Sequence, residues 1–258
     1  MMESDNIMLS VKGVHKQFGG LKALSGVGIE VKKHTVYGLI GPNGAGKTTF
    51  FNVITGLYEP DAGEFMLAGR PYRPNAVHEV AKAGIARTFQ NIRLFGQMTA
   101  LENVMVGRHV RTKGGVIGSI LGLKAVREEE KAIRERAMAL LDYVGIAHYH
   151  DYVARNLSYG HQRRLEIARA LATEPKLLAL DEPAAGMNAT EKVALTGLLR
   201  KIRDDGITIL IIEHDVKLVM GLCDELTVLD YGKILAQGLP EAVRKDPRVI
   251  EAYLGGSH

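Results

Sequence analysis

A glycine-rich run is the first feature of this 258-residue sequence whose residue types and spacing could do chemistry. Residues 41–48, GPNGAGKT, fit the pattern G-x-x-x-x-G-K-[ST] at every fixed position. Glycines let backbone N–H groups wrap a phosphate, while Lys47 is expected to reach the β- and γ-phosphates and the Thr48 hydroxyl to ligate Mg²⁺. The run therefore predicts a nucleoside triphosphate site, whose expected binding residues are Gly41, Pro42, Asn43, Gly44, Ala45, Gly46, Lys47, Thr48 and Thr49.

A pair of carboxylates is the second such feature. Asp181 and Glu182 end the apolar run Leu177–Leu180. Asp181 at the strand end can lie beside the Mg²⁺ held by Thr48, and Glu182 can orient and deprotonate a water aimed at the γ-phosphate. An ordinary exposed strand end is the alternative interpretation, but the phosphate loop upstream favours hydrolysis. A kinase would need an acceptor site, and the sequence offers none.

The elements that must position these residues follow from the hydrophobic pattern. The apolar run Thr35–Ile40 is typical of a strand buried on both faces, and a helix through Leu57 is predicted after the glycine-rich run. The last third alternates predicted strands with predicted helices, namely strands Leu177–Leu180, Ile207–Ile212, Leu226–Leu229 and Lys233–Ala236 and helices Glu191–Arg203 and Asp215–Leu222. This alternation predicts crossovers and a parallel sheet.

Further strands and helices are predicted in the first two thirds of the chain. Strands are predicted at Met8–Val14, Val27–Val31 and Gly63–Ala68, and helices at Ala100–Arg108 and Arg127–Val144. Asn188 followed by Glu191 predicts a helix start with the asparagine as its N-cap.

Composition excludes several function classes. Hydrophobic residues make up 46% of the chain and charged residues 24%, which excludes general disorder. A net charge of +4, no tryptophan and 6% aromatic residues give no reason to expect nucleic acid as a partner. The single cysteine, Cys223, excludes a disulfide framework and favours a reducing cytosol. No apolar run reaches the roughly 18 residues of a spanning helix, so any membrane role is expected to be peripheral.

A third motif, Leu157-Ser-Tyr-Gly-His-Gln162 followed by RRLEIARAL, leads to a family resemblance. The chain resembles the ATP-binding subunit of ABC transporters, whose signature is LSGGQ. The other motifs of that family occur in the same order, with Gln90 in ARTFQ and His214 in IIEHD. Ser158 is also a good N-cap, so the helix after it offers free N–H groups at its start.

The resemblance implies an α/β fold: a P-loop NTPase (ABC ATPase) core with an N-terminal antiparallel β subdomain and an inserted α-helical subdomain. The chain would form a single ABC ATPase domain over residues 1–258, with the helical subdomain at roughly 91–160. ATP and Mg²⁺ would be its cofactors.

The resemblance also implies roles for particular residues. Phe18 would stack on adenine, Gln90 would reach the metal or the attacking water, and His214 would reach the γ-phosphate. Ser158 and Gly160 would cover the ATP held by a second subunit in a head-to-tail dimer. Tyr159 and His161 depart from the signature, where glycine and glutamine are usual.

A narrower resemblance points to one branch of the family. The segments KQFGGLKAL, GLYEPDAGE, ARTFQNIRLF, DEPAAGMN and AYLG look like the ATPase of bacterial branched-chain amino acid importers. This implies a second ATPase subunit, identical or different, integral membrane permease subunits and, indirectly, a periplasmic binding protein. The chain would then lie at the cytoplasmic face of the inner membrane as a peripheral subunit.

Alternatives remain open at this point. They are an ABC ATPase of a lipid-handling or export system, a soluble DNA-associated ABC ATPase, and a nucleotide-gated binding module with little hydrolysis. The sequence has neither the sustained heptads nor the cysteines that long coiled-coil or zinc insertions of DNA-associated members would need. The basic insertion Arg108–Lys124 is expected either to lie near lipid or a membrane subunit or to be an exposed loop.

Overall fold

The computed structural model describes residues 6–109 and 123–254, and these form two compact units. The first unit holds the described residues up to Gln90 and from Lys176 onward, and the second holds those between Asn91 and Pro175. Each unit has its own secondary structure. All of the predicted phosphate and carboxylate residues belong to the first unit.

The larger sheet of the first unit carries the predicted site residues at its strand ends. Its order is β10-β9-β3-β8-β7-β6, with all neighbours parallel except the antiparallel edge pair β9 and β10. Strands β3, β7 and β8 are buried along their whole length, as their apolar sequences predict. The predicted parallel sheet is thereby confirmed, and its strands are β3 (Val36–Ile40), β6 (Ile85–Arg87), β7 (Leu177–Asp181), β8 (Thr208–Ile212), β9 (Glu225–Asp230) and β10 (Lys233–Gly238).

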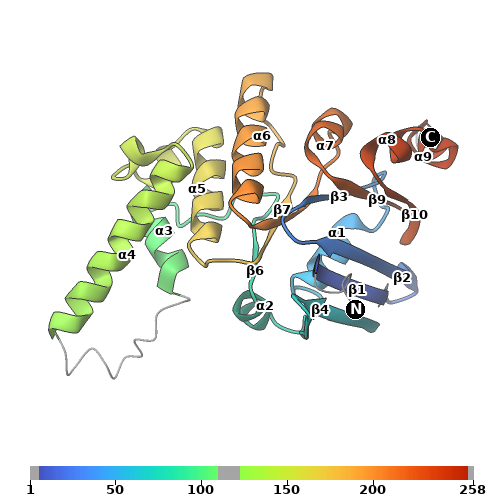
Figure 1. The fold of residues 1–258 in the computed structure, drawn as a ribbon, viewed down its shortest axis with the longest axis horizontal. Helices are drawn as coiled ribbons and strands as arrows, with labels where there is room; N and C mark the ends of the chain where they lie inside the picture. Colours follow the sequence, from blue (N-terminus) through green and yellow to red (C-terminus); the bar gives the residue numbers. More distant parts are fainter. Residues whose placement is uncertain (1–5, 110–122, 255–258) are drawn as a thin grey trace. The chain divides into compact units, whose positions relative to one another are not determined.

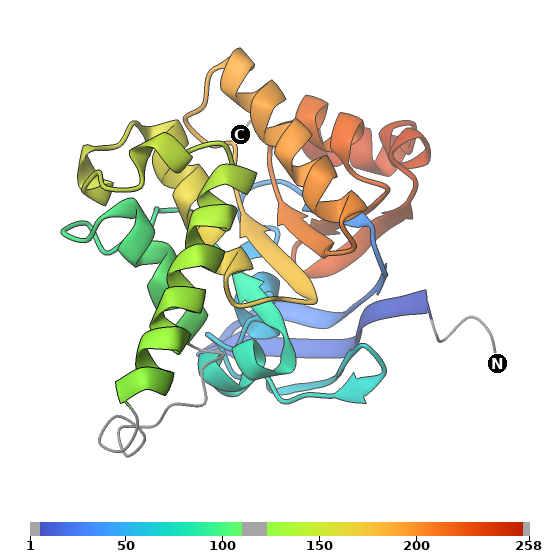
Figure 2. The ribbon, with the colours of Figure 1, turned by 60° about the vertical axis from the view of Figure 1, so that its left-hand side comes forward.

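The second sheet of this unit is antiparallel, and Figure 2 shows its long strands as one layer. Its order is β2-β1-β4-β5, with bounds β1 (Ile7–Phe18), β2 (Leu21–Lys32), β4 (Ala62–Leu67) and β5 (Arg70–Pro71). The predicted N-terminal antiparallel portion is confirmed. Strands β1 and β2 run further than predicted, because the pairing continues through polar residues up to the tight turn at Gly19.

Helix α1 (Lys47–Ile54) packs between the two sheets, while α6 and α7 lie on the other face of the parallel sheet (Figure 1). Phe50, Phe51 and Ile54 of α1 are fully buried in the shared core. This packing fixes the helix whose first residue is Lys47. The remaining helices of the unit are α2 (Val77–Ala83), α6 (Ala189–Asp204), α7 (Val216–Leu222), α8 (Pro240–Arg244) and α9 (Pro247–Leu254).

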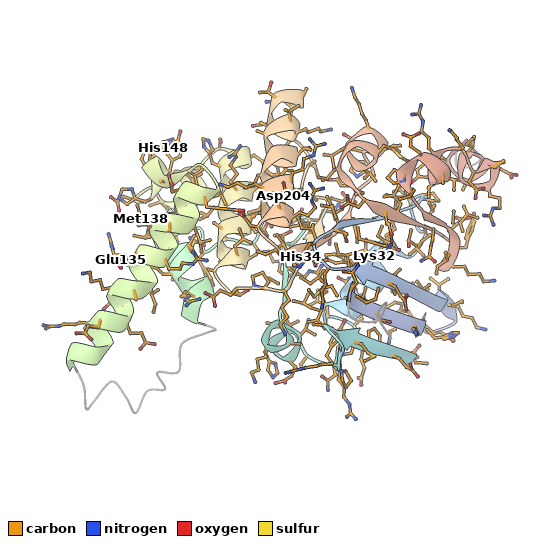
Figure 3. All side chains as sticks on the ribbon, in the orientation of Figure 1. Lys32, His34, Glu135, Met138, His148 and Asp204 are labelled. Atoms are coloured by element: carbon orange, nitrogen blue, oxygen red, sulfur yellow. The ribbon has the colours of Figure 1, made fainter. Side chains whose placement is uncertain are left out.

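Side-chain hydrogen bonds define the ends of several elements in the first unit. The predicted cap of α6 is confirmed, since Asn188 and Glu191 form a reciprocal capping box with bonds of 2.9 and 3.0 Å. His34, labelled beside Lys32 in Figure 3, contacts the turn after α6, because its Nδ1 donates a hydrogen bond to the Gly206 carbonyl at 2.7 Å. The His34 N–H donates to the Thr208 hydroxyl at 2.9 Å, which aligns the start of β3 beside β8.

The second unit is helical. It consists of α3 (Ala100–His109), α4 (Leu123–Tyr143), the short 3₁₀ helices η3 (Ala147–Tyr149) and η4 (Ala154–Asn156), and α5 (Tyr159–Leu171). The sequence placed the end of the inserted part near residue 160, but the unit extends to Pro175, because α5 packs against α3 and α4. Most of the basic insertion lies outside the described residues. At its start, Arg108 pairs with Glu174 at 2.6 Å. Among the described helices, none is both long and apolar enough to cross a bilayer.

Candidate functional site

The glycine-rich run forms a loop between the end of β3 and the start of α1. Gly41, Gly44 and Gly46 have φ values of 148°, 79° and 99°, a region that side chains rarely adopt. A Cβ at Gly41 would also collide with the Leu229 carbonyl oxygen of β9. The sequence therefore needs glycine here both for conformation and for close packing on the sheet.

Lys47 lies at the mouth of this loop. Its side chain folds back, so that Nζ donates to the carbonyls of Gly41 at 2.7 Å and Pro42 at 2.8 Å, and only 8% of the residue is exposed. Burial lowers the pKa of Lys47 from its usual value, and the nearby Glu182 carboxylate opposes that shift. A partly desolvated cation at the start of a helix is a strong binding point for a phosphate.

Glu182 contacts two other predicted site residues, Gln90 and His214, each of which comes from a different sequence motif. It follows β7 directly in a left-handed conformation with φ 45°, and its N–H donates to the Ile212 carbonyl of β8 at 2.9 Å. Its Oε2 accepts a hydrogen bond from Gln90 Nε2 at 2.9 Å and lies 3.5 Å from Nδ1 of His214. The structure thus brings Gln90, Glu182 and His214 together.

A cleft of about 380 Å³ joins this carboxylate to the phosphate loop. Its lining residues are Phe18, Leu21, Lys22, Ala23, Asn43, Gly44, Ala45, Gly46, Lys47, Thr48, Thr49, Glu182, Tyr231 and Gly232. A second cleft, of about 730 Å³, borders the loop at Gly41 and Pro42 and is lined by His214 and by Tyr253 of α9. Phe18, the phosphate loop and Glu182 therefore share one cleft.

Tyr231 is a cleft residue that sequence reasoning missed. It lies in the turn between β9 and β10 with φ 42° and is 86% exposed. The next residue, Gly232, donates its N–H to the Ala45 carbonyl at 2.9 Å and accepts the Ser25 N–H at 2.9 Å. A Tyr-Gly pair between two predicted strands signals a turn, but nothing local signals its contact with the phosphate loop.

Asp181 ends β7 and is buried, with an arginine as its partner. Arg87 of β6 donates Nη2 to Asp181 Oδ2 at 3.2 Å, and its Nη1 donates to Asn52 of α1 at 2.8 Å and to Thr55, the C-cap of that helix, at 2.6 Å. Its guanidinium lies 4.8 Å from the Phe51 ring centroid. Sequence reasoning missed Arg87, although it stands three residues before Gln90 in ARTFQ.

Replacing Arg87 with methionine is expected to lower the free energy of unfolding by about 3–5 kcal/mol, because it leaves the Asp181 carboxylate buried without its counter-charge. Urea unfolding of the wild type, Arg87→Met, Asp181→Asn and the double variant measures this as a cycle. The double variant should recover part of the loss. Strictly additive losses would contradict the pairing.

The signature residues Ser158 and Gly160 belong to the second unit. Ser158 is the N-cap of α5, as predicted, and accepts the His161 N–H at 3.4 Å. The two departures from the signature have local partners: the Tyr159 hydroxyl accepts from Arg163 at 3.2 Å, and the His161 ring lies 4.6 Å from that of Tyr149.

Comparison with known proteins shows which families and relatives this chain is similar to. The family model described as "ABC transporter" matches residues 24–185, and that described as "Branched-chain amino acid ATP-binding cassette transporter" matches residues 233–258. The high-affinity branched-chain amino acid transport ATP-binding proteins LivG of Escherichia coli K12 and BraF of Pseudomonas aeruginosa are each 44% identical to the chain over 249 residues, covering 96% of it and 98% of the relative.

Solved structures agree with these matches. The ADP conformation of an ATP-binding cassette of an ABC transporter superposes with a TM-score of 0.84 at 36% identity, over 96% of this chain and 99% of that one. A dimeric, post-hydrolysis ATP-binding cassette bound to ADP and phosphate superposes with a TM-score of 0.76 at 26% identity, over 90% and 99%. The predicted fold class is confirmed by these likenesses.

Proposed function

Because this chain belongs to the ABC transporter family, we propose that it is the ATP-binding and ATP-hydrolysing subunit of a membrane importer for branched-chain amino acids. The observation that carries the proposal is one cleft lined by Lys47, Thr48 and Glu182, since it places a phosphate-binding loop beside a carboxylate. The resemblance stated from the sequence, and the ATPase class that it implies, are confirmed by the family match.

Nucleotide binding is assigned to the loop from Gly41 to Thr49. Its backbone N–H groups and the start of α1 surround the phosphates, and Lys47 exchanges its contacts with the Gly41 and Pro42 carbonyls for phosphate oxygens. The base lies toward Phe18, which lines the same cleft. A single aromatic ring recognises the base by stacking on its flat face.

The donor set fits Mg²⁺. The candidate ligands, the Thr48 hydroxyl, the Asp181 carboxylate and the Gln90 amide, are all hard oxygen donors. When bound, Mg²⁺ supplies charge neutralisation on the phosphate oxygens.

Hydrolysis is assigned to Glu182 as the general base. Its carboxylate accepts a proton from a water, whose oxygen bonds to the γ-phosphorus while the bond to the β-phosphate oxygen breaks, giving ADP and phosphate. Gln90 and His214 contact Glu182 at 2.9 and 3.5 Å. These contacts keep the Glu182 carboxylate aligned with the phosphate that the water attacks.

The working unit is a dimer of such subunits, identical or different, in which Ser158 and Gly160 of one subunit cover the ATP of the other. A dimeric relative supports this arrangement. The start of α5 carries the positive end of the helix dipole, which is suited to a phosphate bound by the neighbouring subunit. ATP would then shift the equilibrium toward the closed dimer, because it contacts both subunits only in that state.

The same family implies integral membrane permease subunits, a peripheral place at the cytoplasmic face of the membrane and, indirectly, a periplasmic binding protein. Purification of the tagged chain from detergent-solubilised membranes tests the partners, and ATP-dependent uptake of labelled leucine by the reconstituted complex tests the transport. Uptake is expected with the wild type and not with Lys47→Met. Outward transport of a lipid, or DNA-stimulated turnover without membrane partners, would contradict the proposal.

A further inference from the structure

Phe18 is held by two neighbours that do not line the cleft. It ends β1 and is 43% exposed. The ring of Tyr58 meets it edge-on, with centroids 5.3 Å apart and planes at 74°, and the Lys16 ammonium lies over the ring at 5.3 Å from its centroid. Edge-on aromatic pairs and cations over a ring face are both attractive arrangements. Phe18 itself lines the cleft.

Asp61 fixes this arrangement from the turn before β4. Its Oδ1 accepts from Lys16 Nζ at 3.0 Å, and its Oδ2 accepts the Gln17 N–H at 2.6 Å. The Asp61 N–H in turn donates to the His15 carbonyl at 2.9 Å. The carboxylate thus holds both the backbone beside Phe18 and the lysine over its ring.

Holding Lys16 and the Phe18 ring in one orientation costs side-chain entropy, and a role of that orientation in ligand binding would offset this cost. The Lys16 side chain is only 16% exposed, although a lysine near the end of a strand can extend into water. An exposed phenylalanine without such neighbours would sample several rotamers in the free protein. It would lose this freedom when a ligand binds, and that entropy loss would weaken binding. A ring fixed in advance avoids it.

We propose that Lys16, Tyr58 and Asp61 are positioning residues that hold Phe18 as a preformed platform for the nucleotide base, and so set the preference for a nucleoside triphosphate over a bare triphosphate. This inference rests on the proposed function, because it takes the cleft as the ATP site. It assigns base recognition to the end of β1 and the turn before β4, and phosphate recognition to the loop at Lys47.

The test compares ATP with inorganic tripolyphosphate, which lacks a base, by calorimetric titration of the full chain. Phe18→Ala should weaken ATP binding by about tenfold, from the loss of a base–aromatic stack. Asp61→Ala and Tyr58→Leu should weaken it by about threefold to tenfold, as the ring is loosened rather than removed. Tripolyphosphate affinity should not change in any of these variants.

Glu59→Gln is the matched control, because it removes an exposed carboxylate from the same turn. It should leave both affinities unchanged. Equal weakening of ATP and tripolyphosphate by Asp61→Ala and Tyr58→Leu, or unchanged ATP affinity in both, would overturn the positioning role while Phe18→Ala still reports the stack. Failure of the proposed function has a different signature, in which Lys47→Met leaves the affinity for both ligands intact.

Discussion

Glutamine in place of Glu182 is expected to lower ATP turnover by about a hundredfold to ten-thousandfold, the usual contribution of a general base. Glutamine keeps the size of the side chain and can still contact Gln90 and His214, but it cannot accept the proton of the attacking water. Mg-ATP binding should persist, because Lys47 and the loop are untouched. Phosphate release and equilibrium nucleotide binding, measured on the same preparation, separate the two effects.

A carboxylate elsewhere in the same unit provides the control. Glu64→Gln removes an exposed acid on β4 and should retain wild-type turnover. Near wild-type turnover in Glu182→Gln would show that Glu182 is not the base. A parallel loss of binding and turnover would instead assign Glu182 to nucleotide binding.

Methionine in place of Lys47 is expected to weaken ATP binding by roughly tenfold to a hundredfold or more. A hydrogen bond from a charged donor contributes about 1.5–3 kcal/mol, and each 1.4 kcal/mol is about tenfold in affinity. Lys47 is buried at the loop mouth, where water competes weakly for its charge. Equilibrium titration with ATP measures the loss.

Lys217→Met tests whether the effect is specific to the loop. Lys217 is an exposed lysine in α7, so its replacement changes the net charge equally. Its ATP affinity should equal that of the wild type. Equal weakening in both variants would point to the overall charge of the protein rather than to a phosphate contact.

Local sequence patterns predicted the part of the fold that places the phosphate loop. The strand at Thr35–Ile40 is found as β3 (Val36–Ile40), and α1 begins at Lys47, because the glycine pattern fixes both ends of the loop. The helix ends at Ile54 rather than Leu57, since Gly56 is in a left-handed conformation with φ 76° and the Thr55 hydroxyl bonds back to the Phe51 carbonyl. A single glycine within an apolar run gave too weak a signal to place that end.

Long-range contacts account for most of what the sequence could not predict. Arg87 meets Asp181 across 94 positions, and Tyr231 reaches the cleft through a turn between β9 and β10. Neither partner can be found from spacing, because topology alone brings them together. The helices α8 and α9 were also missed, although each begins at a proline, which is favoured at the first helical position.

The most direct test of the central claim is a structure of the Glu182→Gln variant with Mg-ATP. We expect two protomers closed on two nucleotides. Each nucleotide should have its triphosphate on the loop at Lys47, its base on Phe18 and Ser158 of the neighbouring subunit over its γ-phosphate. A single protomer with ATP bound away from Lys47 would contradict this claim.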